Sequence, residues 1–184
     1  MITTITGSCH SEFYNGIHPG NWTKEHWDDT IRYYRELLRD TAGMKIAFGM
    51  EATVQTNMDG PEAHVRFKND LNGDPRVKVC LDPTNMVALD NYYHTTELLA
   101  ECFERLGEDI LGCHAKDPLI LPDKMLCYVT EVAPGKGILD YESYLAHLSR
   151  MKWPRTLFIE HLPNEEYPGA TEFVRKTAAK TGVK

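Results

Sequence analysis

The sequence ILGCHAKD at residues 110–117 is an apolar run that ends on a histidine, followed by a lysine and an aspartate. Short apolar runs of this kind are typical of buried strands in parallel sheets. Three more runs of the chain end on a side chain that can bind a metal ion or carry a proton. They are residues 45–50 before Glu51, residues 77–81 before Asp82, and residues 156–159 before Glu160.

Helical patterns separate these runs. Capping residues and apolar side chains at helical spacing predict helices at residues 23–41, 60–69, 95–106, 140–151 and 170–180. We expect a further strand at residues 1–6 and a loop with a short hairpin at residues 119–137. The alternation of strands and helices predicts an α/β fold with a parallel sheet and helices outside.

Strand parity places the four singled-out residues on one face of this sheet. Side chains alternate between the two faces of a strand. The apolar neighbours of each of these four residues therefore point to the other face of the sheet. We expect those neighbours to be buried under the helices: Phe48, Met50, Val79, Leu81, Leu111, Cys113, Leu157 and Ile159. In parallel sheets the functional residues lie at the carboxyl ends of the strands, so we expect the four side chains to lie close together there.

Three carboxylates and one imidazole together form a plausible site for one divalent metal ion. Oxygen-rich ligation suits Mn, Mg or Co better than structural Zn, although Zn is possible. Four protein ligands leave coordination positions open for substrate oxygens. The alternative is that each residue is simply a polar strand end, and its repetition at four strand ends favours the metal site.

Several stretches resemble the xylose isomerase-like TIM-barrel superfamily, in particular its sugar phosphate isomerase and epimerase branch. They are FGME at 48–51, CLDPTN at 80–85, GCHAKD at 112–117, APGKG at 133–137 and FIEH at 158–161. The resemblance covers nearly the whole chain, and the order and spacing of these motifs carry it. It implies that Glu51, Asp82, His114 and Glu160 ligate one metal ion, and that Glu51 and Glu160 are the catalytic residues.

The resemblance thus implies a metal-dependent sugar isomerase or epimerase. A metal ion bound to a carbonyl and a neighbouring hydroxyl acidifies the C–H bond between them and stabilises an enediolate. One carboxylate removes the proton. For epimerisation, a second carboxylate returns a proton on the opposite face.

Three other residues are candidates for substrate binding. Asn85 stands where many relatives have a histidine; it can bind a sugar hydroxyl or simply form the turn, but it cannot shuttle a proton. Lys116 shares the face of His114 and either meets a substrate oxygen or is a solvated lysine. His10 follows the first strand and can contact substrate there.

The chain supplies about five strand–helix units, whereas a complete barrel of this type has eight strands and about 250 residues. We therefore expect a partial (β/α) TIM barrel in one domain, residues 1–184, that corresponds to the C-terminal part of the barrel. Two sheet edges would then be open. Either another chain covers them, which favours a homo-oligomer, or the chain is truncated.

The composition of the chain limits the kinds of partner that it can bind. A net charge of −7 over 184 residues disfavours nucleic acid, which requires a basic surface. The apolar runs are too short to span a membrane. The chain has five cysteines, an odd number, and none of them are in CxxC spacing. We interpret them as free thiols and expect a cytoplasmic protein. The expected partner is a small sugar.

Two other functions compete with the enzyme. A catalytically degenerate half-barrel that holds a sugar or a partner is the first. An apurinic endonuclease, which shares this barrel, is less favoured because it needs additional histidine ligands that are missing after His114 and at Asn85.

Overall fold

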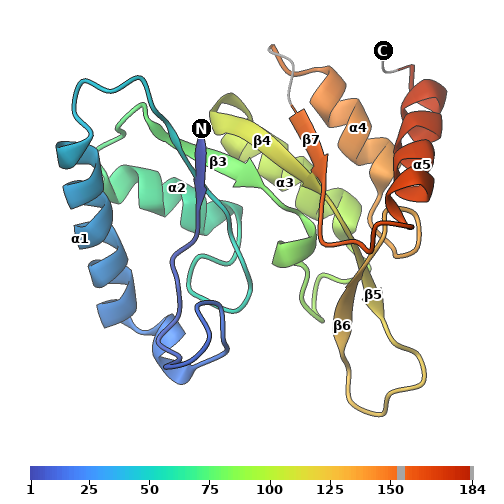
Figure 1. The fold of residues 1–184 in the computed structure, drawn as a ribbon, viewed down its shortest axis with the longest axis horizontal. Coiled ribbons are helices and arrows are strands. Elements are labelled where there is room, and N and C mark those ends of the chain that lie inside the picture. Colours follow the sequence, from blue (N-terminus) through green and yellow to red (C-terminus); the bar gives the residue numbers. More distant parts are fainter. Residues whose placement is uncertain (153–155, 183–184) are drawn as a thin grey trace.

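The computed structural model describes residues 1–152 and 156–182, and in this part of the chain five parallel strands form the main sheet (Figure 1). The strands are β1 (Ile2–Thr4), β2 (Phe48–Met50), β3 (Val77–Leu81), β4 (Ile110–Ala115) and β7 (Thr156–Ile159). They lie in the order β1-β2-β3-β4-β7, each paired with the next in parallel. This order, which follows the chain, confirms the predicted partial α/β barrel.

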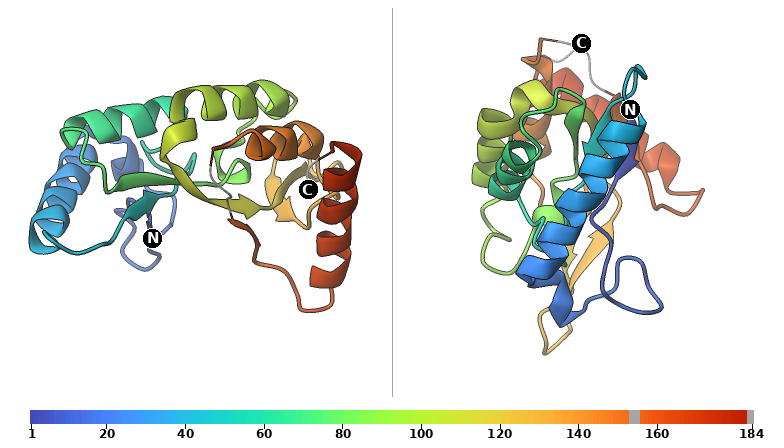
Figure 2. Two further views of the ribbon diagram at one scale, coloured as in Figure 1. Left: turned by 90° about the horizontal axis from the view of Figure 1, so that it is seen from above. Right: turned by 90° about the vertical axis from the view of Figure 1, so that its left-hand side faces the viewer.

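The helices cover one side of the curved sheet (Figure 2, left). They are α1 (Lys24–Asp40), α2 (Pro61–Asp70), α3 (Thr95–Leu106), α4 (Tyr141–Ser149) and α5 (Tyr167–Lys180), with short 3-10 turns η1 (Pro19–Trp22), η2 (Thr84–Met86) and η3 (Gly107–Asp109). As predicted, the Thr23 side chain caps α1 by accepting a hydrogen bond from the His26 amide. Helix α5 begins three residues earlier than expected, with Pro168 in its first turn. No helix in the described ranges is long and apolar enough to cross a membrane.

The hydrophobic core lies between the sheet and these helices. Strand side chains predicted to face the helices, such as Met50 and Leu81, are fully buried there. From the helices, Trp27 of α1 and Phe67 of α2 pack edge to face with ring centroids 6.3 Å apart. This packing holds the strands from their outer side and leaves the inner side for polar residues.

Leu111 is an exception to the predicted burial, because it is 37% exposed. Strand β4 pairs Ile110 with Val79 but Gly112 with Cys80, so Leu111 is an extra residue without an opposite partner on β3. Such a bulge bends the strand and re-aims the side chains that follow. Beyond it, Cys113 pairs with Leu81, which brings His114 level with Asp82.

The predicted hairpin is present and lies outside the barrel sheet. Strand β5 (Asp117–Ile120) pairs antiparallel with β6 (Val129–Val132). Figure 1 shows this hairpin at the end of the sheet where the strands finish, together with the loop that follows β1. The hairpin can therefore deliver side chains to the mouth of the partial barrel.

Within the described residues, β1 and β7 each have a neighbouring strand on one side only. The inner face beside them is partly apolar and open, since Phe158 of β7 is 49% exposed and Met1, which packs over Gly49 and Gly112, is similarly exposed. Open strand edges and exposed apolar surface favour association.

We therefore expect this chain to form a dimer or larger oligomer at low micromolar concentration, measured by sedimentation velocity. Phe158→Glu places a charge on the open inner face and should shift the distribution toward monomer. Tyr33→Glu is the matched control, because Tyr33 is exposed on α1, away from that face. A wild-type chain that sediments as a monomer would contradict the expectation.

A buried histidine makes stability depend on pH. His64 of α2 is buried, and its Nε2 has no hydrogen-bond partner among the described residues. Burial lowers the pKa of His64 from 6.5 to about 4. Between these values the unfolded chain binds more protons than the folded one, so the stability present above pH 6.5 is lost as the pH falls toward 4.

We expect the free energy of unfolding to decrease by an amount on the order of 3 kcal/mol across this window because of His64. His64→Leu should flatten that part of the profile in urea titrations at several pH values. His94→Leu, at an exposed position, is the control. An unchanged pH slope in the His64 variant would show that the window belongs to other groups.

Candidate metal centre

The sheet register brings the four predicted ligands together. Because Leu81 pairs with Cys113 and Ala115 with Ile159, the residues that follow these strands emerge at the same end of the sheet. One ligand atom from each of the four residues lies within 4.8 Å of the others. They are Glu51, Asp82, His114 and Glu160.

His114 is the centre of this cluster. Its Nδ1 lies 3.0 Å from Glu160 Oε1, 3.3 Å from Asp82 Oδ2 and 3.6 Å from Glu51 Oε2. Asp82 is completely buried, and the His114 side chain is nearly so. One imidazole nitrogen therefore faces three carboxylates, of which Asp82 is the most deeply buried and Glu160 the most exposed.

Neighbouring groups orient the carboxylates. The amides of Thr84 and Asn85 donate to Asp82 Oδ1, at 3.1 and 3.3 Å, and leave Oδ2 toward His114. The Asn85 side chain donates to Glu51 Oε1 at 2.7 Å and leaves Oε2 free to face the imidazole. Asn85 thus holds Glu51 in place, and its contact with a substrate stays a prediction.

Lys116 is part of the cluster rather than a solvated lysine. It is 3% exposed, and its Nζ lies 2.7 Å from Glu160 Oε1, 2.9 Å from Asp82 Oδ2 and 3.4 Å from Glu131 Oε2. Two of these oxygen atoms also face His114. The ammonium group consequently neutralises the same carboxylates that are expected to bind a metal ion.

Electrostatics explain why these charges can be buried together. Burial alone would lower the pKa of His114, but its partners, first among them Asp82, outweigh burial and raise the pKa to about 12. Burial also opposes the charge on Lys116, yet the adjacent carboxylates raise its pKa above the usual value. Burial raises the pKa of Asp82, and the two cations more than reverse this effect. A metal ion at Nδ1 would replace the imidazole proton.

Two tyrosines of α4 hold this end of β4 from the outer side. The Tyr144 hydroxyl donates to the His114 carbonyl at 3.1 Å, and the Tyr141 hydroxyl donates to the Lys116 carbonyl at 2.8 Å. Both phenols are buried, which raises their pKa values. The backbone that carries the imidazole and the ammonium is thereby fixed, and the sequence motifs contain no signal for this support.

The cluster opens into a cavity of about 510 Å³, a size typical of small-molecule sites. Three of the four cluster residues, Glu51, His114 and Glu160, line it, while the buried Asp82 does not. The rest of the lining includes Asn85, Lys116, Tyr14, Asn15, Gln55, Glu131 and His161. Glu131 comes from the β5–β6 hairpin and lies 3.2 Å from His161 Nδ1. Sequence reasoning missed Glu131, because nothing in residues 119–137 shows which hairpin side chain faces the cavity.

Strand alternation alone would place His161 on the face opposite Glu160, but His161 lines the same cavity. Its φ of 59° turns the chain directly after β7, so strand alternation no longer applies there. A non-glycine residue in this region of backbone space is uncommon and often occurs at functional sites.

His10 is turned toward its own loop. Its Nδ1 accepts hydrogen bonds from the amides of Glu12 and Phe13, at 3.1 and 3.3 Å. Tyr14 and Asn15 of the same loop line the cavity, whereas His10 is absent from its lining. The substrate contact assigned to His10 stays a prediction.

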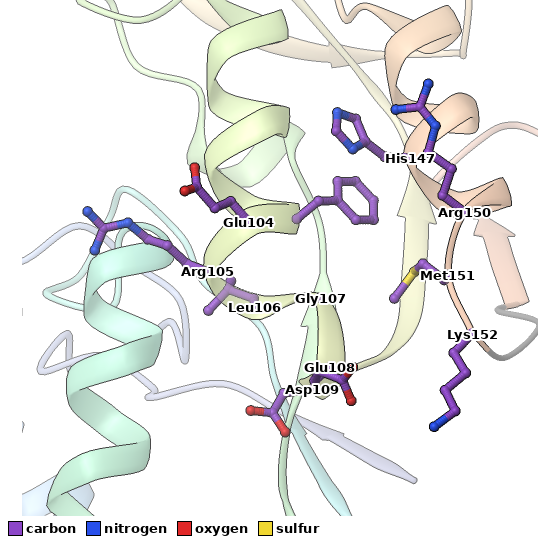
Figure 3. A pocket seen from close by; sticks show the side chains of 11 residues that line it. Glu104, Arg105, Leu106, Gly107, Glu108, Asp109, His147, Arg150, Met151 and Lys152 are labelled. Carbon is purple, nitrogen blue, oxygen red and sulfur yellow. The ribbon is translucent and has the colours of Figure 1, made fainter.

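A second cavity, of about 420 Å³, lies between the carboxyl ends of α3 and α4 (Figure 3). It is located near η3, where β4 begins, and so at the opposite end of the sheet from His114. Phe103 and His147 stack there with ring centroids 4.8 Å apart. Its charges are mixed in sign, and the potential metal-ligand groups in the described residues lie elsewhere.

The chain belongs to the xylose isomerase-like TIM barrel family, whose sequence pattern matches residues 2–177. No curated protein sequence matches it. Among solved structures, the chain is similar to a xylose isomerase-like TIM barrel protein from Mycobacterium smegmatis in complex with magnesium. The two are 16% identical with a TM-score of 0.65, over 98% of this chain and 61% of that chain.

Two further solved structures are similar. An IOLI protein with a bound zinc atom is 20% identical, with a TM-score of 0.62 over 90% of this chain and 60% of that chain. A D-allulose 3-epimerase from Methylomonas sp., in complex with D-allulose, is 18% identical, with a TM-score of 0.57 over 82% of this chain and 47% of that chain. At such identities the likeness shows the fold, and this chain spans about half to three fifths of their lengths.

The cluster fits a divalent cation on its own chemistry. Three carboxylates converge on one imidazole nitrogen, each with one oxygen free of backbone and amide partners. Oxygen ligands with one imidazole suit a hard or borderline ion such as Mg, Mn or Zn.

Purified protein should bind one Mn²⁺ per chain in isothermal titration calorimetry. Asp82→Asn combined with His114→Ala should abolish this binding, because two of the four ligands are lost. Glu172→Gln, on the exposed surface of α5, is the control and should bind normally. Unchanged stoichiometry in the double variant would rule out this site.

Proposed function

We propose that this chain carries the active site of a divalent-metal-dependent sugar isomerase or epimerase. The observation that carries the proposal is the placement of Glu51 and Glu160. Glu51 follows β2 and Glu160 follows β7, so the two carboxylates flank Asp82 and His114 at the mouth of one cavity.

The residues divide the work as follows. Glu51 and Glu160 approach from different strands, so one can remove a proton from a carbon atom and the other can return it on the opposite face. When bound, the metal ion would polarise the sugar carbonyl and stabilise the enediolate. Asn85 holds the Glu51 carboxylate in position through a 2.7 Å hydrogen bond. Lys116 supplies a fixed positive charge next to Glu160.

The similarity to a D-allulose 3-epimerase supports a sugar as the substrate. The cavity volume of about 510 Å³ accommodates a monosaccharide, and its lining offers amide, hydroxyl and carboxylate groups for sugar hydroxyls. Tyr14, Asn15 and Gln55 are among the polar groups at the cavity wall that do not belong to the charged cluster.

The second candidate is a catalytically degenerate half-barrel that binds a sugar without reaction. The contact of Lys116 with both Asp82 and Glu160 favours it, because this ammonium already neutralises two expected metal ligands. A chain that binds sugar but exchanges no carbon-bound proton would support this candidate.

Solvent deuterium should enter a ketose substrate in the presence of Mn²⁺, measured by NMR on ketohexoses and ketopentoses with and without phosphate. Glu51→Gln and Glu160→Gln should each slow exchange by about 10²–10⁴-fold, because an amide cannot accept the proton. Glu166→Gln, whose carboxylate pairs with Lys136 outside the cluster, should exchange at the wild-type rate. Normal exchange in a protein with both cluster glutamates changed would refute their assigned roles.

A further inference from the structure

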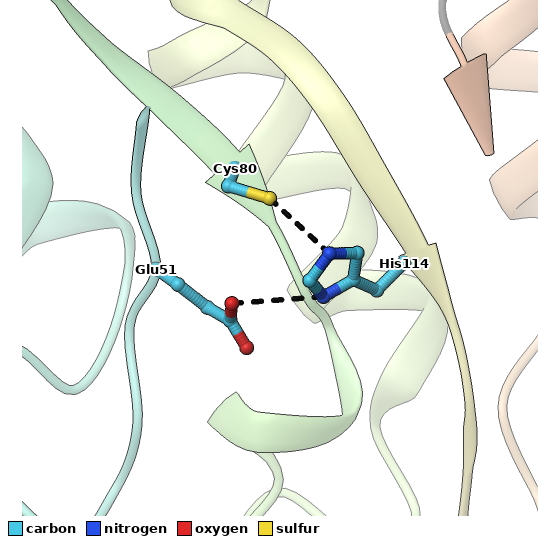
Figure 4. Close-up of side chains that lie close together, drawn as sticks. All are labelled: Glu51, Cys80 and His114. Carbon is cyan, nitrogen blue, oxygen red and sulfur yellow. Dashed lines mark hydrogen bonds and ion pairs between the residues drawn. The ribbon is translucent and has the colours of Figure 1, made fainter. Parts of the chain in front are cut away.

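Cys80 lies beside the imidazole on the inner face of the sheet (Figure 4). Its Sγ is 3.4 Å from His114 Nε2, and the thiol is buried. Glu51 completes a second group of potential ligands, since one atom each of Glu51, Cys80 and His114 lies within 4.8 Å of the others. The sheet register explains this group, because Met50 pairs with Val79 and the next residues are Glu51 and Cys80.

The two ring nitrogens of His114 face chemically different partners. Nδ1 faces the carboxylates of Glu51, Asp82 and Glu160, whereas Nε2 faces the sulfur. Without a metal ion, the Cys80 thiol and Nε2 of His114 share a hydrogen bond. An ion at Nε2 would take the place of a proton there.

Gly112 leaves room beside Cys80 for the side chain of Met1. A Cβ atom added at Gly112 would lie 3.8 Å from Cys80 Sγ and 2.8 Å from the Met1 methyl group. Met1 and Phe158 make this side of the sulfur apolar, whereas the His114 ring and the Glu51 carboxylate lie near the sulfur as polar groups. Apolar surroundings disfavour a free thiolate but not one that is neutralised by a cation.

The internal cation lies on the other side of the cluster. Among the described residues, Lys116 Nζ forms ion pairs with Asp82, Glu131 and Glu160. None of these belongs to the sulfur-containing group. An ion can therefore bind to Cys80, His114 and Glu51 while the ammonium keeps its partners, whereas an ion held by Asp82 and Glu160 must compete with it.

We propose that Glu51, Cys80 and His114 form a second, sulfur-containing metal site that prefers thiophilic divalent ions such as Zn²⁺ or Cd²⁺. Thiolate, imidazole and carboxylate are all zinc ligands, and three protein ligands leave one position open. Binding deprotonates the Cys80 thiol, and the proton is released to solvent. Glu51 and His114 belong to both ligand sets, and two divalent cations held on the same imidazole and carboxylate would repel each other, so the chain holds one ion at a time.

Co²⁺ is the probe that tests this site, because a thiolate ligand adds an intense near-ultraviolet charge-transfer band that oxygen and nitrogen ligands do not give. Reduced wild-type protein titrated with Co²⁺ should show the band at one equivalent. Cys80→Ser and Cys80→Ala should lose it and should bind Zn²⁺ at least tenfold more weakly, while retaining Mn²⁺. Cys9→Ser is the matched control, since Cys9 Sγ also lies 3.6 Å from a histidine nitrogen, that of His26.

Glu160→Gln separates this proposal from the proposed function. Glu160 is outside the sulfur-containing group, so this variant should keep the cobalt–sulfur band while losing proton exchange. Wild-type protein that binds Co²⁺ without the band, or a band that survives both Cys80 variants, would overturn the second site. Absence of Mn²⁺ binding and of proton exchange, with the band intact, would overturn the proposed function alone.

Discussion

Buried charge governs this end of the molecule. Asp82 is completely inaccessible to solvent, and two cations, His114 and Lys116, contact its outer oxygen at 3.3 and 2.9 Å. A buried carboxylate is costly unless it is paired and hydrogen-bonded. The pairing depends on strands β3, β4 and β7 ending at the same level, so the parallel register and the charge cluster require each other.

Support for the cluster comes from behind the sheet as well as from within it. The hydroxyls of Tyr141 and Tyr144 bind the carbonyls of Lys116 and His114, and the Asp117 carboxylate accepts hydrogen bonds from the amides of Gly135 and Leu139. Helix α4 and the end of the hairpin are thereby tied to β4. These hydrogen bonds fix the positions of the His114 and Lys116 side chains, and both metal binding and proton transfer require such fixed positions.

The sequence was sufficient to predict the strands and the four residues at their ends, because apolar runs and the residue that ends each run are local features. It was not sufficient for Lys116, whose burial depends on Glu160 and Asp82 from other strands. The bulge at Leu111 and the positive φ of His161 both change the direction of side chains. Neither feature can be recognised from the alternation of apolar and polar residues in the sequence. Glu131 reaches the cavity only because the hairpin folds back over the strand ends.

The bulge in β4 also bears on how the protein folds. Asp82 and His114 are separated by 32 residues, and their contact forms only when β3 and β4 pair in the offset register that the extra residue creates. A pairing shifted by one residue would turn His114 toward the helices. Long-range strand pairing is slow because the entropy of loop closure must be overcome first. The attraction between the imidazole and the carboxylates therefore stabilises the native register relative to registers shifted by one residue.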